Sequence, residues 1–251
     1  MLYPLFLLVP FVCAWGRIGH ETVAYIAQNH VKTNLTSVLK FNGSLPSIAN
    51  WPDRIRGRTH KYDRLHYVNV SPGSCEYIPS DCHKRRCVVA AIEDFGSHID
   101  SVQNLSLLTH FCGDIAQPLH VTEKMHIGNN ITVEFMGRKT SFHSLWDSGL
   151  INAFVTDQFQ GNVSNFQSNL LKQSFSHDVL SVSPQHWANE TAQVSCREDI
   201  WRDIHDGARI GKDYADRMRY IIENQLISAG VRLARIIDRY FDHKTIFIIQ
   251  N

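Results

Sequence analysis

The sequence lacks any apolar run long enough to cross a membrane, apart from a short one at its start. A spanning helix needs about 18 or more consecutive apolar residues, and TIFIIQ at 245–250 is far shorter. The chain also lacks a Pro/Gly/Ser-rich linker, an internal repeat and any block of like charge. We therefore expect one folded domain over residues 15–251 rather than two smaller ones.

The sequence has no excess of either charge. Its 25 Lys and Arg residues nearly balance its 24 Asp and Glu residues, so the formal net charge is +1. This balance argues against a protein that holds duplex nucleic acid on a broad basic face. A small site whose positive charge comes from bound metal remains compatible with it.

The N-terminal segment MLYPLFLLVPFVCA, residues 1–14, is apolar and contains no Lys or Arg. Val12 and Ala14 are the small residues that signal peptidase recognises, so we interpret residues 1–14 as a cleaved secretory signal peptide. The mature chain then begins at Trp15. The alternative is an uncleaved apolar strand or helix at the N-terminus.

Cysteines and Asn-x-Ser/Thr sequons agree with passage through a glycosylating, oxidising compartment. The sequons begin at Asn34, Asn42, Asn69, Asn104, Asn130, Asn162 and Asn189. Without Cys13 five cysteines remain, which predicts two disulfides and one free thiol. The expected bridges are Cys82–Cys87 and Cys75–Cys196, with Cys112 free and buried. We expect the protein to be secreted or luminal, including in a lysosome-like compartment.

Apolar residues recur at three- and four-residue steps over 87–115 and again over 212–241. This periodicity predicts two long buried helices. Residues 23–27 predict part of a shorter helix, while HYVNV at 66–70 and NNITVEFMG at 129–137 predict brief extended pieces. The fold class is therefore mainly α with minor β structure.

Several of the fourteen histidines stand near carboxylates. In THFCGDIAQPLH, His110 and Asp114 are four residues apart, so on a helix they share one face. The proline after this helix turns the chain, so that His120 can return toward that face. FHSLWDSG repeats the spacing with His143 and Asp147. A histidine and a carboxylate on one face form a nitrogen and oxygen ligand pair for zinc.

Each of these residues alone has an ordinary interpretation. A His/Asp pair at this spacing is more often a surface hydrogen bond than a metal site. Asp53 of WPDRIR would be a helix cap or turn residue, and His66 of LHYVNV a core histidine on a strand. Two such pairs and His120 in one secreted chain nevertheless favour a metal site.

Taken together, WGRIGH, WPDRIR, HYVNV, THFCGDIAQPLH and HSLWD occur in an order that resembles the zinc-dependent single-strand nucleases of fungi and plants, the S1/P1 family. That family shares a compact helical fold with bacterial zinc phospholipases C. The resemblance runs from Trp15 to about Asp147, with weaker support from SAGVRLA at 228–234. All nine ligand positions of the family are filled.

The resemblance implies three zinc ions held by nine residues. The sets are Asp53, His66, His110 and Asp114 for the first ion; Trp15, through its α-amine and carbonyl, His20 and a bridging Asp114 for the second; and His120, His143 and Asp147 for the third. The amine of Trp15 exists only after the leader is removed. An α-amine titrates near 7.7 to 8, so it can lose its proton to a metal at mild pH.

The resemblance also implies the reaction: hydrolysis of single-stranded DNA and RNA to 5′-phosphate products by a monomer, with activity on 3′-nucleotides. Asp53 and Arg56 would be catalytic, the arginine binding a phosphate oxygen in the transition state. Tyr67 would stack a nucleobase, which favours unpaired strands. Without the resemblance, Arg56 would be a surface arginine and Tyr67 a core aromatic residue.

The chain departs from the family pattern at two places. Asn69 stands where the family usually has an aspartate that binds the base edge, so the base contact would pass to an amide. His126 and Asn129 stand where relatives commonly have an acidic residue and a second glycine, so this loop would shape the cleft differently. His126 is either an extra phosphate contact or an exposed side chain, and we favour the exposed one.

Two other functions fit parts of the pattern. A zinc phospholipase C shares the implied fold, but its last ligand is typically glutamate, and this chain has Asp147. A secreted glycoprotein could instead use zinc only structurally to bind a partner. Arg56 and Tyr67 count against that interpretation, because closed structural sites need no base platform.

Overall fold

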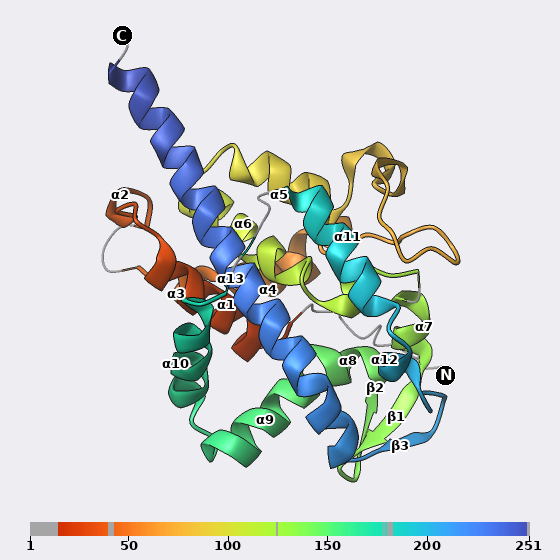
Figure 1. Ribbon diagram of the computed structural model, residues 1–251. Helices are drawn as coiled ribbons and strands as arrows, with labels where there is room; N and C mark the ends of the chain where they lie inside the picture. Colours follow the sequence, from red (N-terminus) through yellow and green to blue (C-terminus); the bar gives the residue numbers. More distant parts are fainter. Residues whose placement is uncertain (1–14, 40–42, 124, 178, 180–182, 250–251) are drawn as a thin grey trace, which may run out of the picture.

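The computed structural model describes residues 15–39, 43–123, 125–177, 179 and 183–249, and these residues are mainly helical, as predicted (Figure 1). The α-helices are α1 (Arg17–His30), α2 (Thr36–Leu39), α3 (Leu45–Ile48), α4 (Trp51–Thr59), α5 (Val88–Gly96), α6 (Val102–Asp114), α7 (Met125–Asn130), α8 (Phe142–Ser144), α9 (Leu150–Phe159), α10 (Val163–Ser174), α11 (Pro184–Ser195), α12 (Glu198–Trp201) and α13 (Lys212–Ile249). Single 3-10 turns lie at Asp63–Leu65, Pro79–Asp81, His83–Arg85 and Pro118–His120. Within the described residues, no helix combines the length and apolar character that a membrane crossing needs.

The long helix α13 crosses the whole molecule, and α1 packs against it (Figure 1). The close approach depends on Gly230 of α13. A Cβ atom there would lie 2.6 Å from Cβ of Ile26 and 3.0 Å from the carbonyl oxygen of Val23. Both predicted helices are confirmed and extend beyond the predicted ranges. The contact holds α1, which carries His20, against the core.

The predicted helix over 87–115 is wrong as a single element, because α5 ends at Gly96 and α6 begins at Val102. Ser97 donates its hydroxyl to the carbonyl oxygens of Glu93 and Asp94, while Ser101 is extended and its side chain caps α6. Ile99 lies fully buried between the two helices. The apolar periodicity therefore continues through residues 97–101, where the helix is interrupted, and α5 and α6 are two separate helices.

A small sheet of strand order β2-β1-β3 lies beside the lower end of α13 in Figure 1. β1 (Thr132–Phe135) pairs antiparallel with β2 (Arg138–Ser141) and parallel with β3 (Ala208–Ile210). β1 confirms the extended piece within 129–137, but β2 and β3 were not predicted. Among the described residues, the predicted extended segment 66–70 forms a single isolated bridge, between Val68 and Val121.

Two disulfides tie the loops to the helices, Cys75–Cys196 and Cys82–Cys87. Both are the predicted pairs. Cys112 is free and buried on α6, and burial raises the pKa of its thiol. A thiol kept protonated in this way is chemically inert.

Candidate metal centre

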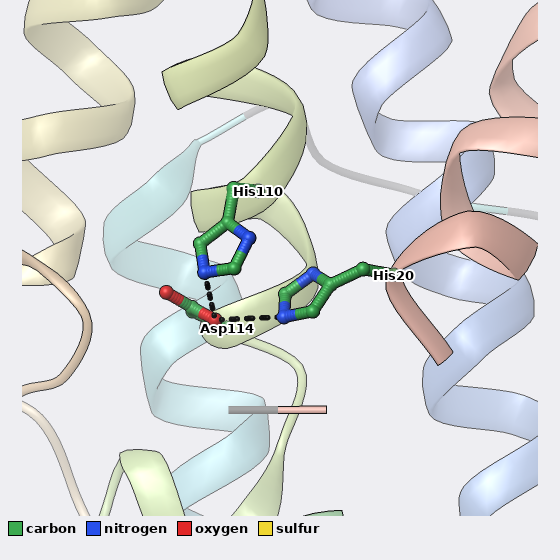
Figure 2. Close-up of side chains that lie close together, drawn as sticks. All are labelled: His20, His110 and Asp114. Atoms are coloured by element: carbon green, nitrogen blue, oxygen red, sulfur yellow. Dashed lines mark ion pairs between the residues drawn. The ribbon is translucent and has the colours of Figure 1, made fainter. Parts of the chain in front are cut away.

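His110 and Asp114 lie on one face of α6, as the four-residue spacing predicted, and both are fully buried. His20 reaches the same point from α1 (Figure 2). Oδ1 of Asp114 lies 3.4 Å from Nε2 of His20 and 3.5 Å from Nε2 of His110. The two imidazole rings stack with their centroids 3.8 Å apart. These three residues form the first group of metal-ligating side chains.

Asp53 and His66 approach His110 from the other side. Asp53 lies in the first turn of α4, and its Oδ1 is 3.4 Å from Nε2 of His110. Nδ1 of His66 lies 3.2 Å from the same Nε2 and 2.9 Å from Oδ2 of Asp114. Asp53, His66 and His110 form a second group. The two oxygens of Asp114 thus face different partners, which suits a carboxylate that bridges two cations.

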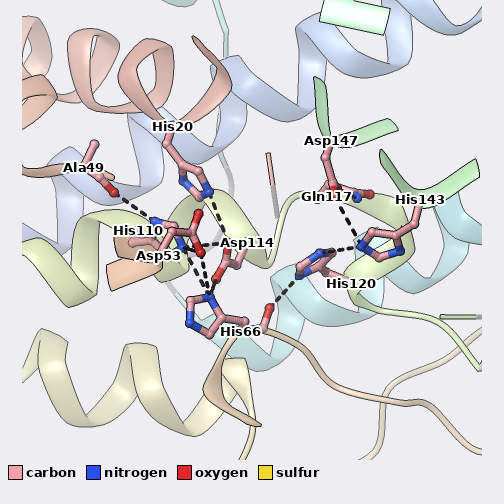
Figure 3. Close-up of polar contacts among 10 residues, drawn as sticks. All are labelled: His20, Ala49, Asp53, His66, His110, Asp114, Gln117, His120, His143 and Asp147. Carbon is pink, nitrogen blue, oxygen red and sulfur yellow. Dashed lines mark hydrogen bonds and ion pairs between the residues drawn. The ribbon is translucent and has the colours of Figure 1, made fainter. Parts of the chain in front are cut away.

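The third group contains His120, His143 and Asp147 (Figure 3). Nε2 of His143 lies 3.1 Å from Nε2 of His120 and 3.6 Å from Oδ2 of Asp147. The sequence pattern suggested a regular α-helix from His143 to Asp147. Instead, α8 ends at Ser144 and a π-helical turn follows over Leu145–Gly149. The pair nevertheless stays within reach of one cation.

The three groups have the donor set that a zinc ion requires. Within each group the ligand atoms lie within 4.8 Å of one another. Several of these buried atoms have no hydrogen-bond partner in the described part of the chain: Nε2 of His20, Oδ1 of Asp53, Nε2 of His66, both carboxylate oxygens of Asp114 and Nδ1 of His143. Orphaned buried polar atoms are costly, and imidazole nitrogens with carboxylate oxygens are ordinary zinc ligands. The residues present therefore fit metal ions.

Backbone and amide groups orient the ligands. Nδ1 of His110 donates to the carbonyl oxygen of Ala49 at 2.9 Å. Nδ1 of His120 donates to the carbonyl oxygen of His66 at 2.7 Å. A carbonyl oxygen only accepts, so each ring keeps its Nε2 lone pair for the cluster. These partners were missed by sequence reasoning, because they depend on tertiary contacts.

Gln117 and Gly113 were also missed, although both stand inside the motif THFCGDIAQPLH. Nε2 of Gln117 donates to Oδ1 of Asp147 at 2.7 Å, which leaves the other carboxylate oxygen for His143. A Cβ atom on Gly113 would lie 2.6 Å from Nδ1 of His20. Their positions between two ligands were the only sequence signal.

Burial and neighbouring charges shift the pKa of several groups in the cluster. Burial raises the pKa of the Asp114 and Asp147 carboxyls well above their usual range. Burial also lowers the pKa of His120 to about 4. His110 meets the same burial penalty, but the charges of Asp114 and Asp53 raise its pKa to about 9. A divalent cation would favour ionised carboxylates and neutral imidazoles throughout.

Trp15 is fully buried immediately before α1. The N–H of the next residue, Gly16, donates to the carbonyl oxygen of Asp147 at 2.6 Å. The start of the helix that carries His20 is thereby joined to the third group. The role of the Trp15 α-amine as a ligand stays a prediction.

The predicted substrate residues stand close in sequence to two metal-ligating residues, Asp53 and His66. Arg56 is one turn after Asp53 on α4, and its side chain is 13% exposed. Tyr67 follows His66 and is half-buried, while Asn69 is exposed. The side chain of His126 lies outside the described residues. A cation thus follows one metal-ligating residue on α4, and a half-buried aromatic residue and an exposed amide follow His66 in the chain.

Comparison with known proteins identifies the family of this chain. The family model described as S1/P1 Nuclease matches residues 15–242. Nuclease P1 of Penicillium citrinum is 33% identical, covering 89% of this chain and 97% of its own. Endonuclease 4 of Arabidopsis thaliana is 30% identical, covering 92% and 90%, and nuclease S1 of Aspergillus oryzae is 25% identical, covering 89% and 91%. The chain therefore belongs to the S1/P1 nuclease family.

Proposed function

We propose that this protein is a secreted, zinc-dependent endonuclease that hydrolyses single-stranded DNA and RNA to 5′-phosphate products and also acts on 3′-nucleotides. The observation that carries the proposal is the convergence of three His/Asp groups around orphaned buried ligand atoms. Membership of a nuclease family supports the same reaction class. The similar chains include proteins named endonuclease.

The proposed ligand sets are those that the sequence predicts. Asp53, His66, His110 and Asp114 would hold one ion, and His120, His143 and Asp147 would hold another. His20, Asp114 and the backbone of Trp15 would hold the remaining ion. Asp114 would serve two sets, and the contacts of its two oxygens with different histidines support this role. Bound zinc would supply Lewis acidity and lower the pKa of water near a phosphodiester.

The side chains around the cluster position the substrate. Arg56 donates to a phosphate oxygen and offsets the negative charge that grows in the transition state. Tyr67 stacks an unpaired base, which excludes a base that stays within a duplex. Asn69, with both a donor and an acceptor, contacts the base edge.

The proposed ligand role of Trp15 requires that the chain be cut immediately before this residue. Removal of residues 1–14 as a signal peptide frees the α-amine of Trp15, and the family match begins at this residue. The two disulfides support passage through an oxidising compartment. Among the sequons, Asn34, Asn130 and Asn162 are exposed and are the proposed glycosylation sites, while Asn69 is exposed but keeps a free amide for the substrate. Asn42 lies outside the described residues.

Metal content and substrate choice test the proposal together. Mass spectrometry of the mature, zinc-loaded protein should find about three zinc ions per chain. Rates should then be compared on single-stranded DNA, the matching duplex and a phosphatidylcholine. Preference for the single strand is the expected result. Lipid cleavage would favour a phospholipase C, and zinc binding without hydrolysis of any phosphoester would favour a structural glycoprotein.

A further inference from the structure

Arg56 points one edge of its guanidinium at Asp63. Nε of Arg56 lies 3.5 Å from Oδ1 of Asp63, and that oxygen is buried with no hydrogen-bond partner among the described groups. Asp63 begins the 3-10 turn Asp63–Leu65, which leads directly into His66. The pair thus joins α4 to the segment that carries a metal-ligating histidine.

The carboxylate of Asp63 is held from its other side by His60. Nδ1 of His60 lies 2.9 Å from Oδ2 of Asp63. His60 has a φ of 50°, and its backbone N–H donates to the carbonyl oxygen of Arg56 at 3.2 Å as α4 ends. The left-handed turn folds the chain back, so that His60 can reach Asp63. Oδ1 of Asp63 therefore faces Arg56, and Oδ2 faces His60.

The opposite edge of the Arg56 guanidinium is unpaired. Its Nη1 atom is buried and has no hydrogen-bond partner in the described part of the chain. A buried charged donor without an acceptor is costly, and the Nη edge of arginine matches two oxygens of a phosphate. Arg56 lies three residues after Asp53 on α4, so the two side chains stand on the same side of that helix. The unpaired edge therefore belongs to a side chain on the side of α4 that carries Asp53, a residue of the second metal-ligating group.

We propose that Asp63, held by His60, is a positioning residue for Arg56: it fixes the Nε edge of the guanidinium so that the Nη atoms face a phosphate oxygen beside the metal centre. This inference rests on the proposed phosphodiesterase function. Among the described residues Asp63 belongs to none of the three metal-ligating groups, and in this proposal it acts through Arg56. Replacing Asp63 should therefore have no further effect on hydrolysis once Arg56 has been replaced.

A double-mutant cycle tests this dependence on the mature, zinc-loaded protein with a single-stranded oligonucleotide. Asp63→Ala should lower kcat about tenfold with little change in KM, while zinc content stays full. Asp63→Asn keeps an oxygen acceptor and should retain more activity than Asp63→Ala. In the Arg56→Ala background, Asp63→Ala should cost nothing further. Asp94→Ala removes the Asp94 carboxylate from Arg85 on the surface and is the matched control, with unchanged kinetics.

A binding measurement gives a second readout. Thymidine 5′-phosphate and thymidine are titrated into each variant by calorimetry, and the gain in affinity from the phosphate is compared. Asp63→Ala and Arg56→Ala should reduce this gain to a similar extent. An equal phosphate gain in Asp63→Ala and the unsubstituted protein would overturn the positioning role.

The possible results distinguish failure of the positioning role of Asp63 from failure of the proposed phosphodiesterase mechanism. Unchanged kcat in Arg56→Ala would remove Arg56 from the proposed mechanism and Asp63 with it. If Arg56→Ala slows hydrolysis but Asp63→Ala does not, only the positioning role is wrong. The same holds if the two losses multiply in the double variant, because independent effects would show that Asp63 acts through another group.

Discussion

Asp114 turns its Oδ2 atom to Nδ1 of His66 at 2.9 Å, which leaves its Oδ1 atom for the other side of the cluster. That side contains His20 and His110. A carboxylate divided in this way can hold two cations at once. An amide cannot do so equally well, because only its oxygen is a good ligand for a hard or borderline cation.

Asp114→Asn should therefore lose at least one zinc ion and most phosphodiesterase activity. The melting temperature should also fall, because bound metal stabilises only the folded state. Metal content by mass spectrometry, hydrolysis of single-stranded DNA and thermal unfolding measure the three effects. A variant with full zinc and full activity would show that Asp114 does not bridge.

Gly113→Ala should displace His20, since the new methyl group would lie 2.6 Å from Nδ1 of that ring. The ring is fully enclosed, so it cannot move aside without leaving the cluster. We expect the loss of about one of the three proposed zinc ions and at least a tenfold fall in kcat, with the helices retained. The neighbouring variant Cys112→Ala is the control: it should lower stability through a cavity but keep its zinc.

Tyr67→Ala should weaken cleavage of oligonucleotides and 3′-mononucleotides while zinc content stays intact. Loss of base stacking, worth ~1 to 3 kcal/mol, corresponds to a ten- to hundredfold fall in kcat/KM. Tyr67→Phe keeps the ring and should retain most of the rate. Identical kinetics in Tyr67→Ala and the unsubstituted protein would place the base elsewhere.

A protein that retains one extra residue before Trp15 should lose a zinc ion and most activity. The extra residue converts the α-amine into an amide, which is not a basic nitrogen donor, and the chain ahead would enter the cleft. The helical circular dichroism should persist, since the other two sites keep all their ligands. Removal of the extension by a protease should restore metal and rate when zinc is added. Equal zinc content and rate in both forms would reduce Trp15 to a buried aromatic residue.

In the metal-free protein, protonation of His120 should favour unfolding as the pH falls from about 6.5 toward 4, while the buried Asp114 and Asp147 carboxyls, whose pKa is raised, act in the opposite sense. Burial lowers the folded-state pKa of His120 to about 4, against an unfolded value near 6.5. Between these values the unfolded chain binds the proton and the folded chain does not, so unfolding becomes more favourable as the pH falls. His20, His66 and His143 shift in the same direction.

Urea midpoints of the zinc-stripped protein at pH 4, 5 and 6.5 measure this effect. His120→Asn should flatten part of the pH dependence, because asparagine does not titrate. His110 acts in the opposite sense: its pKa is raised to about 9, so its contribution is present below pH 6.5 and is lost as the pH rises through 9. A pH dependence that is the same in His120→Asn and in the unsubstituted protein would contradict the assignment of a neutral, buried His120.

The sequence by itself determined the features that depend on neighbours along the chain. The spacing of His110 and Asp114 places both on one face of α6, because a helix repeats every 3.6 residues. Apolar periodicity identified α1 and α13 for the same reason. The bridge Cys82–Cys87 closes a loop short enough to be recognised from spacing alone.

Only the tertiary structure decided the features that join distant segments. The carbonyl oxygen of Ala49 orients His110, and β3 pairs with β1 from a remote part of the chain. Apolar periodicity could not show the break between α5 and α6, because a buried residue such as Ile99 keeps the same pattern in a helix or a loop. The approach of Asp63 to Arg56 likewise depends on a left-handed turn at His60. Such contacts follow from how helices pack and how chains turn, and local sequence spacing encodes neither.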